Sequence, residues 1–498
     1  MTAGRSLEEL SDLVGGDLVI GSVSRAPAIT DVVHDSRQAA PGALFVAVRG
    51  AAVDGHRFVD QAVAAGAVAV CVETEQAATV PQILVADTRR AMGPLAARVH
   101  DDPSRSLAVI GVTGTNGKTT VTHYVESIAR NAGVATGLIG TVGVRVVDES
   151  TMSDRTTPEA TDLQRLLAKM RDAGCQLVSV EVSSHALSLH RVRAIRFEVA
   201  AFTNLSQDHL DFHGDMARYL AAKETMFHEY ELGTAVINVD DPAGRAIADR
   251  YRGALVEVGA GGDARAESIV PTATGSAFRL ITPWGDRDVE AAVTGRFNVD
   301  NAVVAAVCSL AAGVGLEDVS TGLAGLPGVP GRFERVSADD PVTVIVDYAH
   351  TPAGISHAIA TARGITGGRV IAVVGAGGDR DRDKRPLMGE AVSAADVAVI
   401  TSDNPRSEDP RSIVESVVEG LDAGIVQIVE IDRRRAIEVA LSEARSGDVV
   451  LILGRGHEPF QEIAGEKIAF DDRAVAVSTL ALLRRSTNSG TGTGSMGG

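Results

Sequence analysis

The chain has 498 residues, of which 45% are hydrophobic and 22% charged, and its formal net charge is −18. That length exceeds what one hydrophobic core organises and predicts about three domains. The negative balance excludes a general binder of nucleic acids or anionic membranes, so an anionic ligand needs locally gathered arginine and lysine. Three scattered cysteines, no signal segment and no long apolar span predict a cytoplasmic protein without membrane insertion.

The first section, residues 1–104, is predicted to be a small α/β domain. Ser6-Leu7-Glu8-Glu9 is a capping box for a short helix, and strand-like runs occur at Ala43–Val48 and Ala67–Val72. Polar residues gather near the turns, as in His34-Asp35-Ser36-Arg37. By spacing alone, an ordinary turn explains Ser36 and Arg37 as well as a binding site does.

After a linker at Asp101–Ser104, the second section (residues 105–331) repeats a strand–loop–helix pattern. Continuous apolar runs that end in polar clusters are typical of parallel strands whose ligand lies beyond their carboxyl ends. These runs are Leu107–Val112, Leu177–Val182, Val199–Thr203 and Ala235–Val239. A charged, more β-like insertion is expected at Ala254–Val293, followed by an alanine-rich helix.

The third section, residues 332–485, continues the same pattern. Its expected strands are Val342–Val346, Val370–Val374, Val397–Ile400 and Val449–Leu453. Four strands that end in polar loops define one rim of a sheet, and hence one binding edge. Residues 486–498 are rich in Gly, Ser and Thr and are expected to be a disordered tail.

The stretch Gly114–Thr120, GTNGKTT, follows an apolar strand and precedes helix-compatible sequence. Its glycines allow backbone N–H groups to converge on phosphate oxygens, and the helix start adds partial positive charge. Lys118 is placed to reach the β- and γ-phosphates, and the Thr119 hydroxyl to bind Mg²⁺. The spacing departs from the strict P-loop because Gly111 lies one residue too far upstream of Gly117. We predict nucleotide binding here, with a plain glycine turn as the alternative.

Phosphoryl transfer from ATP also needs Mg²⁺, which prefers hard oxygen ligands. Glu181 ends a strand expected to be buried, where a carboxylate requires a partner. By chemistry alone, Thr119 and Glu181 are the better magnesium ligands, and His209 is better explained as a hydrogen-bonding residue.

Five motifs in order, spanning most of the chain, resemble the Mur ligases, and especially those members that add meso-2,6-diaminopimelate. They are Gly114–Thr120, Glu181–His185, Asn204–Gly214, Asp347–Pro352 and Asp403–Arg406. The resemblance implies an α/β fold of three domains. These are an N-terminal UDP-substrate-binding domain, a central ATPase domain with a mostly parallel P-loop sheet, and a C-terminal domain with a Rossmann-like sheet that binds the amino acid.

The resemblance also implies a reaction. A carboxylate of UDP-N-acetylmuramoyl-L-alanyl-D-glutamate attacks the γ-phosphate of ATP, and the amine of meso-diaminopimelate then displaces phosphate from the acyl phosphate. This is a step of peptidoglycan precursor synthesis, and so of cell-wall biogenesis, cell shape and cell division. The implied partners are these small molecules and Mg²⁺, with no nucleic acid, and the expected state is a monomer.

Site residues follow from the same resemblance, position by position. The implied catalytic residues are Lys118, Glu181, His209 and Lys223, and the implied magnesium ligands are Thr119, Glu181, His209 and Lys223 as a carbamate. The implied ATP contacts are Gly114, Thr115, Asn116, Gly117, Lys118, Thr119, Thr120, Asn298, Arg332 and Asp347. The implied UDP-substrate contacts are His34, Ser36, Ala51, Ala52, Val53, Thr156, Thr157, Ser183 and Arg191. The implied diaminopimelate contacts are Arg380, Asp403, Asn404, Pro405, Arg406, Gly454 and Glu458.

Several of these residues have a plainer explanation. Lys223 is otherwise a helix-surface lysine, Arg332 an ion-pair residue at a domain junction, and Arg406 a solvated loop residue. Three positions also depart from the commonest family pattern. Arg155 precedes the Thr-Thr pair where Asn is frequent, Leu189 replaces a common Gln, and Arg455 stands where Lys is commoner between two glycines, a change we expect to be mild.

The Asp403–Arg406 loop indicates the amino acid that is added. Diaminopimelate carries a distal carboxylate, which a guanidinium binds in a bidentate manner, whereas Arg406 would repel the ammonium of lysine. Glu458 suits the distal ammonium of diaminopimelate. Alternative functions are a D-alanyl-D-alanine-adding ligase, a folylpolyglutamate synthase, and a P-loop regulator or motor that hydrolyses ATP without these substrates.

Overall fold

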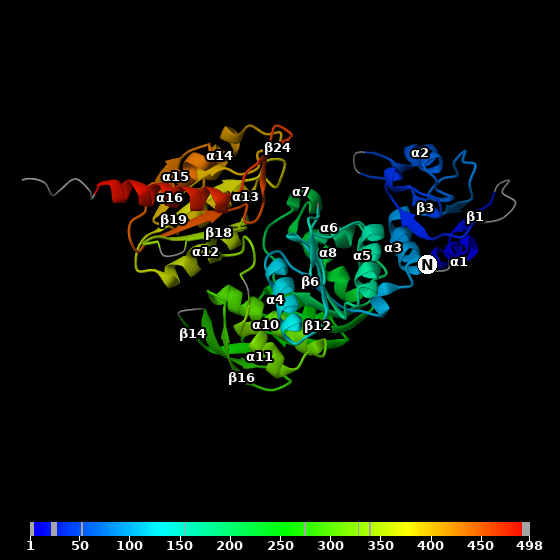
Figure 1. The fold of residues 1–498 in the computed structure, drawn as a ribbon, viewed down its shortest axis with the longest axis horizontal. Helices are drawn as coiled ribbons and strands as arrows, with labels where there is room; N and C mark the ends of the chain where they lie inside the picture. Colours follow the sequence, from blue (N-terminus) through cyan, green and yellow to red (C-terminus); the bar gives the residue numbers. More distant parts are fainter. Residues whose placement is uncertain are drawn as a thin grey trace, which may run out of the picture.

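The computed structural model describes residues 4–20, 27–50, 53–153, 155–272, 275–326, 328–337 and 340–490. The chain forms three consecutive α/β units, each with its own sheet. In Figure 1 the central unit (cyan to green) lies between the N-terminal unit (blue) and the C-terminal unit (yellow to red). The fold class predicted from the sequence is confirmed.

The N-terminal unit has a five-stranded sheet in the order β1-β5-β4-β3-β2, in which only β1 is antiparallel to its neighbour. Its elements are α1 (Leu7–Val14), β1 (Asp17–Val19), β2 (Asp31–Val33), β3 (Ala43–Val46), α2 (Val59–Ala64), β4 (Ala69–Val72), β5 (Gln82–Leu84) and α3 (Thr88–Val99). Short 3₁₀ turns lie at Ser36–Gln38, Gly55–Phe58 and Pro103–Arg105. The Ser6 half of the predicted capping box is confirmed, because the Ser6 hydroxyl accepts a hydrogen bond from the Glu9 amide at 3.1 Å.

The central unit has an eight-stranded sheet in the order β13-β12-β11-β6-β10-β7-β8-β9, parallel from β13 to β7. Its strands are β6 (Ala108–Thr113), β7 (Thr136–Gly140), β8 (Gly143–Val146), β9 (Glu149–Thr151), β10 (Leu177–Glu181), β11 (Phe197–Phe202), β12 (Leu232–Asn238) and β13 (Ala254–Val258). Its helices are α4 (Lys118–Asn131), α5 (Ala160–Asp172), α6 (Ser184–Ser188), α7 (Leu210–His213), α8 (Met216–His228), α9 (Pro242–Arg250), α10 (Arg296–Ala311) and α11 (Leu316–Ala324). Each expected strand of this section is present.

The expected insertion at Ala254–Val293 is divided in the structure. Its first strand, β13, pairs in parallel with β12 and extends the main sheet, because Val256 and Val258 are buried in the core of that sheet. The remainder forms a separate antiparallel sheet of β14 (Arg265–Pro271), β15 (Ser276–Ile281) and β16 (Arg287–Ala291). The insertion is therefore shorter than the sequence indicated.

The C-terminal unit has a six-stranded sheet in the order β17-β18-β22-β19-β20-β21, parallel except for β17. Its strands are β17 (Glu334–Arg335), β18 (Thr343–Asp347), β19 (Val370–Ala376), β20 (Val397–Ser402), β21 (Val426–Val429), β22 (Val449–Leu453) and the separate hairpin β23 (Phe460–Ile463) and β24 (Glu466–Ala469). Its helices are α12 (Pro352–Ile365), α13 (Lys384–Val392), α14 (Pro410–Val418), α15 (Arg433–Glu443) and α16 (Asp472–Gly490). Because α16 continues to Gly490, the start of the predicted disordered tail is helical, and residues 491–498 lie outside the described residues.

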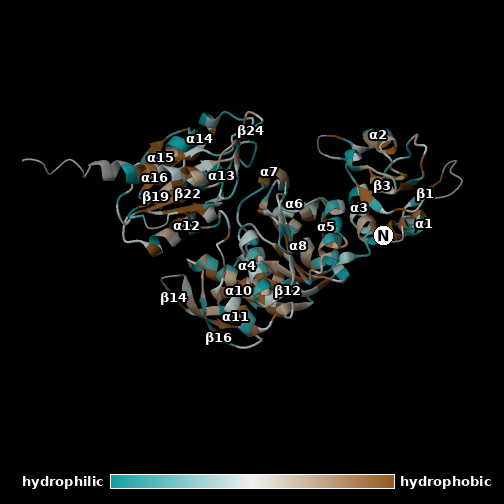
Figure 2. Cartoon of the chain, viewed as in Figure 1, coloured by the Kyte–Doolittle hydropathy of each residue, from teal (hydrophilic) through white to brown (hydrophobic). Residues whose placement is uncertain are grey.

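Apolar side chains cover both faces of the central and C-terminal sheets. Val109 and Ile110 are neighbours on β6, yet they belong to separate hydrophobic clusters on opposite faces of the sheet. Along β19, Val370–Val374 alternate between two further clusters in the same way, and Figure 2 shows β19 and β22 as mostly hydrophobic (brown). A strand buried on both faces needs continuous apolar sequence, and this explains the runs seen in the chain. Polar residues are left for the strand ends, where the site forms.

Candidate active site

The Gly114–Thr120 loop joins the end of β6 to the first turn of α4. Gly114 and Gly117 have φ of 147° and 87°, a region that favours glycine. A Cβ at Gly114 would lie 1.9 Å from the Thr203 hydroxyl, and one at Gly117 would lie 2.5 Å from Asn301 Oδ1. Lys118 Nζ donates to the carbonyls of Gly114 and Thr115 at 3.0 and 2.8 Å. The predicted strand–turn–helix geometry is confirmed.

Glu181 is buried at the end of β10, and hydroxyl and amide donors satisfy its carboxylate. Thr119 Oγ1 donates to Glu181 Oε2 at 2.9 Å, and the Thr141 amide donates to Oε1 at 2.7 Å. Arg332 Nη2 in turn donates to Thr119 Oγ1 at 2.8 Å. Oxygen ligands suited to Mg²⁺ thus lie beside the loop, together with a guanidinium from the third section of the chain.

Lys223 is a buried residue of α8, with 1% of its surface exposed, so the helix-surface explanation is wrong. Its Nζ donates to the Gly114 carbonyl at 2.7 Å and lies 4.5 Å from the centre of the Tyr219 ring. Burial, together with the charge of Lys118, holds the pKa of Lys223 well below its usual value. An amine of this kind is readily neutral and nucleophilic.

His209 immediately precedes α7 and has a φ of 57°, and burial lowers its pKa to about 3. Its neutral ring lies 4.8 Å from the ring of His185, and its Nε2 lies 3.4 Å from Asp208 Oδ2. Asp208 also pairs with Lys384 Nζ at 2.9 Å and with His350 Nε2 at 3.2 Å. Burial raises the pKa of Asp208, but the charge of Lys384 and the hydrogen bond with His350 outweigh burial and hold this pKa well below its usual value. The sequence motifs contained Asp208 and His350 but gave them no role, and Lys384 was missed, because no local pattern links these three residues.

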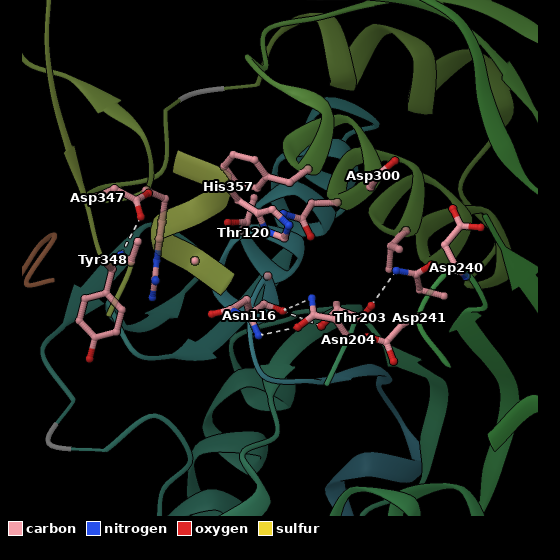
Figure 3. Close-up of a pocket in the computed structure, with 18 of the residues that line it drawn as sticks. Asn116, Thr120, Thr203, Asn204, Asp240, Asp241, Asp300, Asp347, Tyr348 and His357 are labelled. Carbon is pink, nitrogen blue, oxygen red and sulfur yellow. Dashed lines mark hydrogen bonds between the residues drawn. The ribbon is translucent and has the colours of Figure 1, made fainter. Parts of the chain in front are cut away.

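A cavity of about 360 Å³ opens beside the loop, between the central and C-terminal units. Figure 3 shows Asn116, Thr203 and Asn204 at its floor, with Asp347 and Tyr348 on one side and Asp240 and Asp241 on the other. The lining also includes Gly117, Thr120, Phe297, Asn301, Arg332 and His357. This lining is suited to a nucleoside, because it combines aromatic and amide side chains beside a phosphate-type loop.

Three of the implied ATP contacts differ in how they meet this cavity. Asn298 is buried, donates to the Thr294 carbonyl at 2.9 Å and is absent from the lining, whereas Asn301 one turn later lines it. Arg332 stacks on Tyr348, with its guanidinium carbon 4.3 Å from the ring centre. The Asp347 carboxylate accepts hydrogen bonds from the Phe333 and Ala349 amides, and burial raises its pKa.

A second cavity, of about 600 Å³, lies between the N-terminal and central units. Its lining includes His34, Ser36, Arg37, Val53, Arg89, Arg155 and Glu159. Ser36 is buried and donates to Gln61 Oε1 at 3.2 Å, whereas Arg37 is exposed and pairs with Asp35. Ala51 and Ala52 lie outside the described residues.

Thr156, Thr157, Ser183 and Arg191 connect the second cavity to Glu181. The hydroxyls of Thr156 and Thr141 form a hydrogen bond of 3.0 Å, and the Thr157 hydroxyl donates to the Glu181 carbonyl at 2.7 Å. Ser183 caps α6, and Arg191 Nη1 donates to the Thr157 carbonyl at 3.3 Å. Glu159, which sequence reasoning missed, pairs with three arginines: Arg89, Arg155 and Arg191.

The Asp403–Arg406 loop follows β20 at the rim of the C-terminal sheet. Arg406 has a φ of 53°, donates to the Gly378 carbonyl at 2.7 Å and lies 3.5 Å from Glu462 Oε2. Its side chain is 22% exposed, so the solvated-loop explanation is wrong. Asn404 Nδ2 donates to Glu458 Oε2 at 2.8 Å. A Cβ on Gly454 would lie 2.5 Å from Asp403 Oδ2, while Arg380 is exposed nearby in the β19–α13 loop.

The hairpin β23–β24 supports this loop, a role that sequence reasoning missed. Gln461 Nε2 donates to the Asp403 carbonyl, and the Glu462 amide donates to Asn404 Oδ1 at 2.8 Å. The Arg406 amide donates to the Glu462 carbonyl at 3.0 Å, and the Ala464 amide donates to the Arg406 carbonyl at 2.7 Å. The sequence offered only a weak signal, a short alternating run after residue 459.

Comparison with known proteins gives matches along nearly the whole chain. Family models described as "Mur ligase family, catalytic domain", "Mur ligase middle domain" and "Mur ligase, glutamate ligase domain" match residues 28–100, 112–309 and 331–456. The UDP-N-acetylmuramoyl-L-alanyl-D-glutamate–2,6-diaminopimelate ligase of Geobacillus thermodenitrificans is 47% identical over 463 residues, covering 90% of this chain and 94% of that protein.

A ligase of the same name from Streptomyces coelicolor is 44% identical over 486 residues, covering 94% of this chain and 95% of that protein. Among solved structures, another protein of that name aligns over 97% of this chain and 99% of its own, with a TM-score of 0.69 and 31% identity. MurF from Acinetobacter baumannii, at 22% identity and a TM-score of 0.66, shares the fold.

Proposed function

This chain belongs to the Mur ligase family, and we propose that within it the protein is the ligase that adds meso-2,6-diaminopimelate to UDP-N-acetylmuramoyl-L-alanyl-D-glutamate. It is an enzyme of peptidoglycan synthesis that uses ATP to form an amide bond. The observation that carries the proposal is a set of side-chain contacts between the central and C-terminal units. Arg332 donates to Thr119 of the Gly114–Thr120 loop, and Lys384 pairs with Asp208. The C-terminal unit, which we propose binds the amino acid, therefore contacts the central unit, which we propose binds ATP.

The residues have roles that suit an acyl-phosphate mechanism. A carboxylate is a poor acyl donor, and transfer of the γ-phosphoryl group gives it a good leaving group. In this proposal, Lys118 and Arg332 offset negative charge on the transferring phosphoryl group. The Thr115 and Asn116 amides of the loop donate to Asn204 instead. The amine of the amino acid then attacks the acyl carbon, and phosphate departs. Positioning of three ligands at one junction supplies much of the catalysis.

Mg²⁺ fits the oxygen donors beside the loop. Thr119 and Glu181 would hold it, since their side-chain oxygens are 2.9 Å apart, and the metal would neutralise charge on the β- and γ-phosphates. Among the described residues there is no group of three or more His, Cys, Asp or Glu side chains that could hold a metal ion. Phosphate oxygens, His209 and a modified Lys223 are the proposed remaining ligands.

Lys223 is proposed to act as a carbamate. Its buried amine has a pKa well below the usual value, and the neutral form is the one that reacts with carbon dioxide. A buried ammonium would repel Mg²⁺, whereas a carbamate offers oxygen ligands like those of a carboxylate. The close contact with Gly114 supports a role beside the phosphates.

The division of labour follows the three units. We propose domains at residues 1–104 for the UDP moiety, 105–331 for ATP, and 332–485 for the amino acid. The second cavity would hold the nucleotide end of the UDP-substrate near Ser36, and Thr156, Thr157 and Arg191 would lead its peptide toward Glu181. Asp403–Arg406, Arg380, Gly454 and Glu458 would hold diaminopimelate, with Arg406 on the distal carboxylate.

Further parts of the proposal concern where the protein works and with what. All of its proposed partners are small molecules, and the net charge of −18 argues against nucleic acid. No helix among the described residues is long and apolar enough to cross a membrane. We propose a cytoplasmic monomer, since ATP and nucleotide-linked precursors are its substrates.

The test is phosphate release by the purified protein, measured with ATP and Mg²⁺, with and without the UDP-linked dipeptide and diaminopimelate. We expect release only when both are present, together with an amide-linked product of matching mass. A panel of diaminopimelate, lysine and ornithine tests specificity, and diaminopimelate should be strongly preferred. Substrate-independent turnover would favour the motor alternative, and product with D-alanyl-D-alanine or glutamate would favour the other ligases.

A further inference from the structure

Arg455 follows β22, between Gly454 and Gly456, and its side chain is completely buried. A buried guanidinium is costly unless its donors and its charge are compensated. Among the described residues, Arg433 is the other arginine with a fully buried side chain, and it pairs with Asp472 through two hydrogen bonds of 2.8 and 2.7 Å. Arg455 Nε lies 3.9 Å from that same carboxylate, which is too far for a hydrogen bond, so the hydrogen-bond partners of Arg455 lie elsewhere.

The donors of Arg455 point to the Asp403–Arg406 loop and to the β23–β24 hairpin that supports it. Nη1 donates to Asn404 Oδ1 at 2.8 Å, and Nη2 donates to the carbonyls of Phe460 and Phe470. Nη1 also lies 3.7 Å from Glu458 Oε2. One planar group therefore joins the Asn404 side chain to both ends of the hairpin.

These contacts fix which way the Asn404 amide faces. Oδ1 accepts from Arg455 and also from the Glu462 amide at 2.8 Å. With its oxygen held by two donors, Asn404 directs its Nδ2 to Glu458 Oε2 at 2.8 Å. A flipped amide would set a donor against two donors and an oxygen against a carboxylate.

We propose that Arg455 is a positioning residue for diaminopimelate: through Asn404 it orients the Glu458 carboxylate that receives the distal ammonium of the substrate. This inference rests on the proposed function. Arg455 itself need not touch the amino acid, since Asn404 carries its effect.

The charges around Glu458 give Arg455 a second effect. Burial raises the pKa of Glu458, and the neighbouring Asp403 raises it further. Donation from Asn404 and the charges of Arg455 and His350 oppose this rise. Arg433, on α15, pairs with Asp472, and its charge also interacts with Asp403 and Glu458. Because an ammonium is bound by the ionised carboxylate, removing the Arg455 charge should raise the pH below which diaminopimelate binding is lost.

Lysine and arginine are not equivalent at this position. A lysine would retain the charge near Glu458, but its ammonium cannot span Asn404 and the two hairpin carbonyls in one plane. Arg455→Lys therefore separates charge from geometry. Arg455→Met and Arg455→Gln both remove the charge but pack differently. If one variant misfolds, the other still tests the effect of removing the charge.

The experiment measures the KM of each substrate and the calorimetric affinity for diaminopimelate across a pH series, in wild type and in these variants. For Arg455→Met or Arg455→Gln we expect a rise in the KM for diaminopimelate of about tenfold or more, with the KM values for ATP and the UDP-substrate unchanged. The low-pH limit of diaminopimelate binding should move to higher pH. Arg455→Lys should restore that limit and raise the KM only a few-fold.

Arg433→Lys is the matched control, because it alters an equally buried arginine that does not contact Asn404. It should lower thermal stability and leave the diaminopimelate KM and pH limit unchanged. A folded neutral variant with wild-type KM and pH limit would overturn the inference. So would failure of both neutral variants to fold while Arg455→Lys matches wild type, since Arg455 would then be purely structural. If wild type itself does not use diaminopimelate, the proposed function fails instead.

Discussion

Arg406 combines a strained backbone with a half-buried guanidinium, and these two features have a common cause. The left-handed backbone at this residue, with a φ of 53°, lets its amide and carbonyl pair with the hairpin while Nη1 holds the Gly378 carbonyl. Non-glycine residues adopt this region at a cost that surrounding contacts must offset. The loop is thus built to present one guanidinium in one pose.

Arg406→Ala should raise the KM for diaminopimelate by roughly 10- to 150-fold, which corresponds to the loss of about 1.5–3 kcal/mol for hydrogen bonds to a charged group. Steady-state kinetics and a thermal melt of the same sample measure this. The KM for ATP and the melting temperature should change little. Arg411→Ala, on the exposed start of α14, is the control. Parallel losses of activity and thermal stability would instead indicate a structural role for Arg406.

Lys223→Ala should abolish ligation, because it removes both the proposed carbamate and its contact with Gly114. A short carboxylate such as acetate should restore part of the activity by filling the vacated space. Product formation is measured with and without added acetate. Lys169→Ala, on the exposed face of α5, should behave as wild type. Unchanged turnover in Lys223→Ala would remove this residue from the site.

At the scale of elements, the site depends on how strands end. β6, β10 and β11 are neighbours in the central sheet, and their carboxyl ends lead to the Gly114–Thr120 loop, Glu181 and Thr203. Parallel pairing places these ends at one edge, where the first turn of α4 adds its partial positive charge. The glycines of the loop allow the chain to turn from strand to helix within this space.

Gly117→Ala tests the loop as an element. An alanine here would have to adopt left-handed backbone, with a φ of 87°. Its Cβ would lie 2.5 Å from Oδ1 of Asn301, whose side chain lines the cavity of about 360 Å³. We expect the KM for ATP to rise about tenfold or more, because left-handed strain of about 1–2 kcal/mol is added to the displacement of Asn301.

Gly133→Ala is the matched control beyond the other end of α4. Gly133 has a φ of 76°, and its Cβ would meet no atom within 4 Å. The Gly133→Ala protein should lose roughly 1–2 kcal/mol of its free energy of unfolding, measured by denaturant titration, and keep its KM for ATP. Equal KM values for ATP in the two variants would contradict the proposed cradle.

At the scale of the whole molecule, side chains connect units that are far apart in sequence. Lys384 and Asp208 form an ion pair of 2.9 Å in which both side chains are 6% exposed. Arg332 reaches Thr119 across the same junction. Buried pairs of this kind impose a specific arrangement, because each charge becomes costly once its partner is absent. The cavity of about 360 Å³ lies between the two units that they join.

Lys384→Met should destabilise the protein by roughly 3–5 kcal/mol, since it leaves Asp208 buried with a weaker set of partners. In calorimetry we also expect the C-terminal unit to melt apart from the central one. Lys169→Met removes an exposed pair with Glu149, in which the side chains are 56% and 79% exposed, and should change stability by less than about 1 kcal/mol. Similar effects of the two substitutions would show that the Lys384 pair does not couple the units.

The sequence alone predicts the parallel strands that end at the site, the Gly114–Thr120 loop and the kind of chemistry. Val109–Val112 and Val370–Val374 are apolar without interruption, and local physics makes such runs buried strands with polar loops at their ends. The GTNGKTT turn likewise fixes its own backbone through its glycines. The roles of the individual site residues remain predictions.

Only the tertiary structure decided which distant side chains meet. It shows that Lys223 is buried, that Asp208 pairs with Lys384, and that Arg455 donates to Asn404. No local sequence pattern relates the residues of these pairs. The tertiary structure also decided that Ala254–Val258 extends the central sheet, since strand pairing depends on the neighbour rather than on the strand alone. Periodicity reports which face of an element is buried, but contacts between elements arise from the packing of the whole chain.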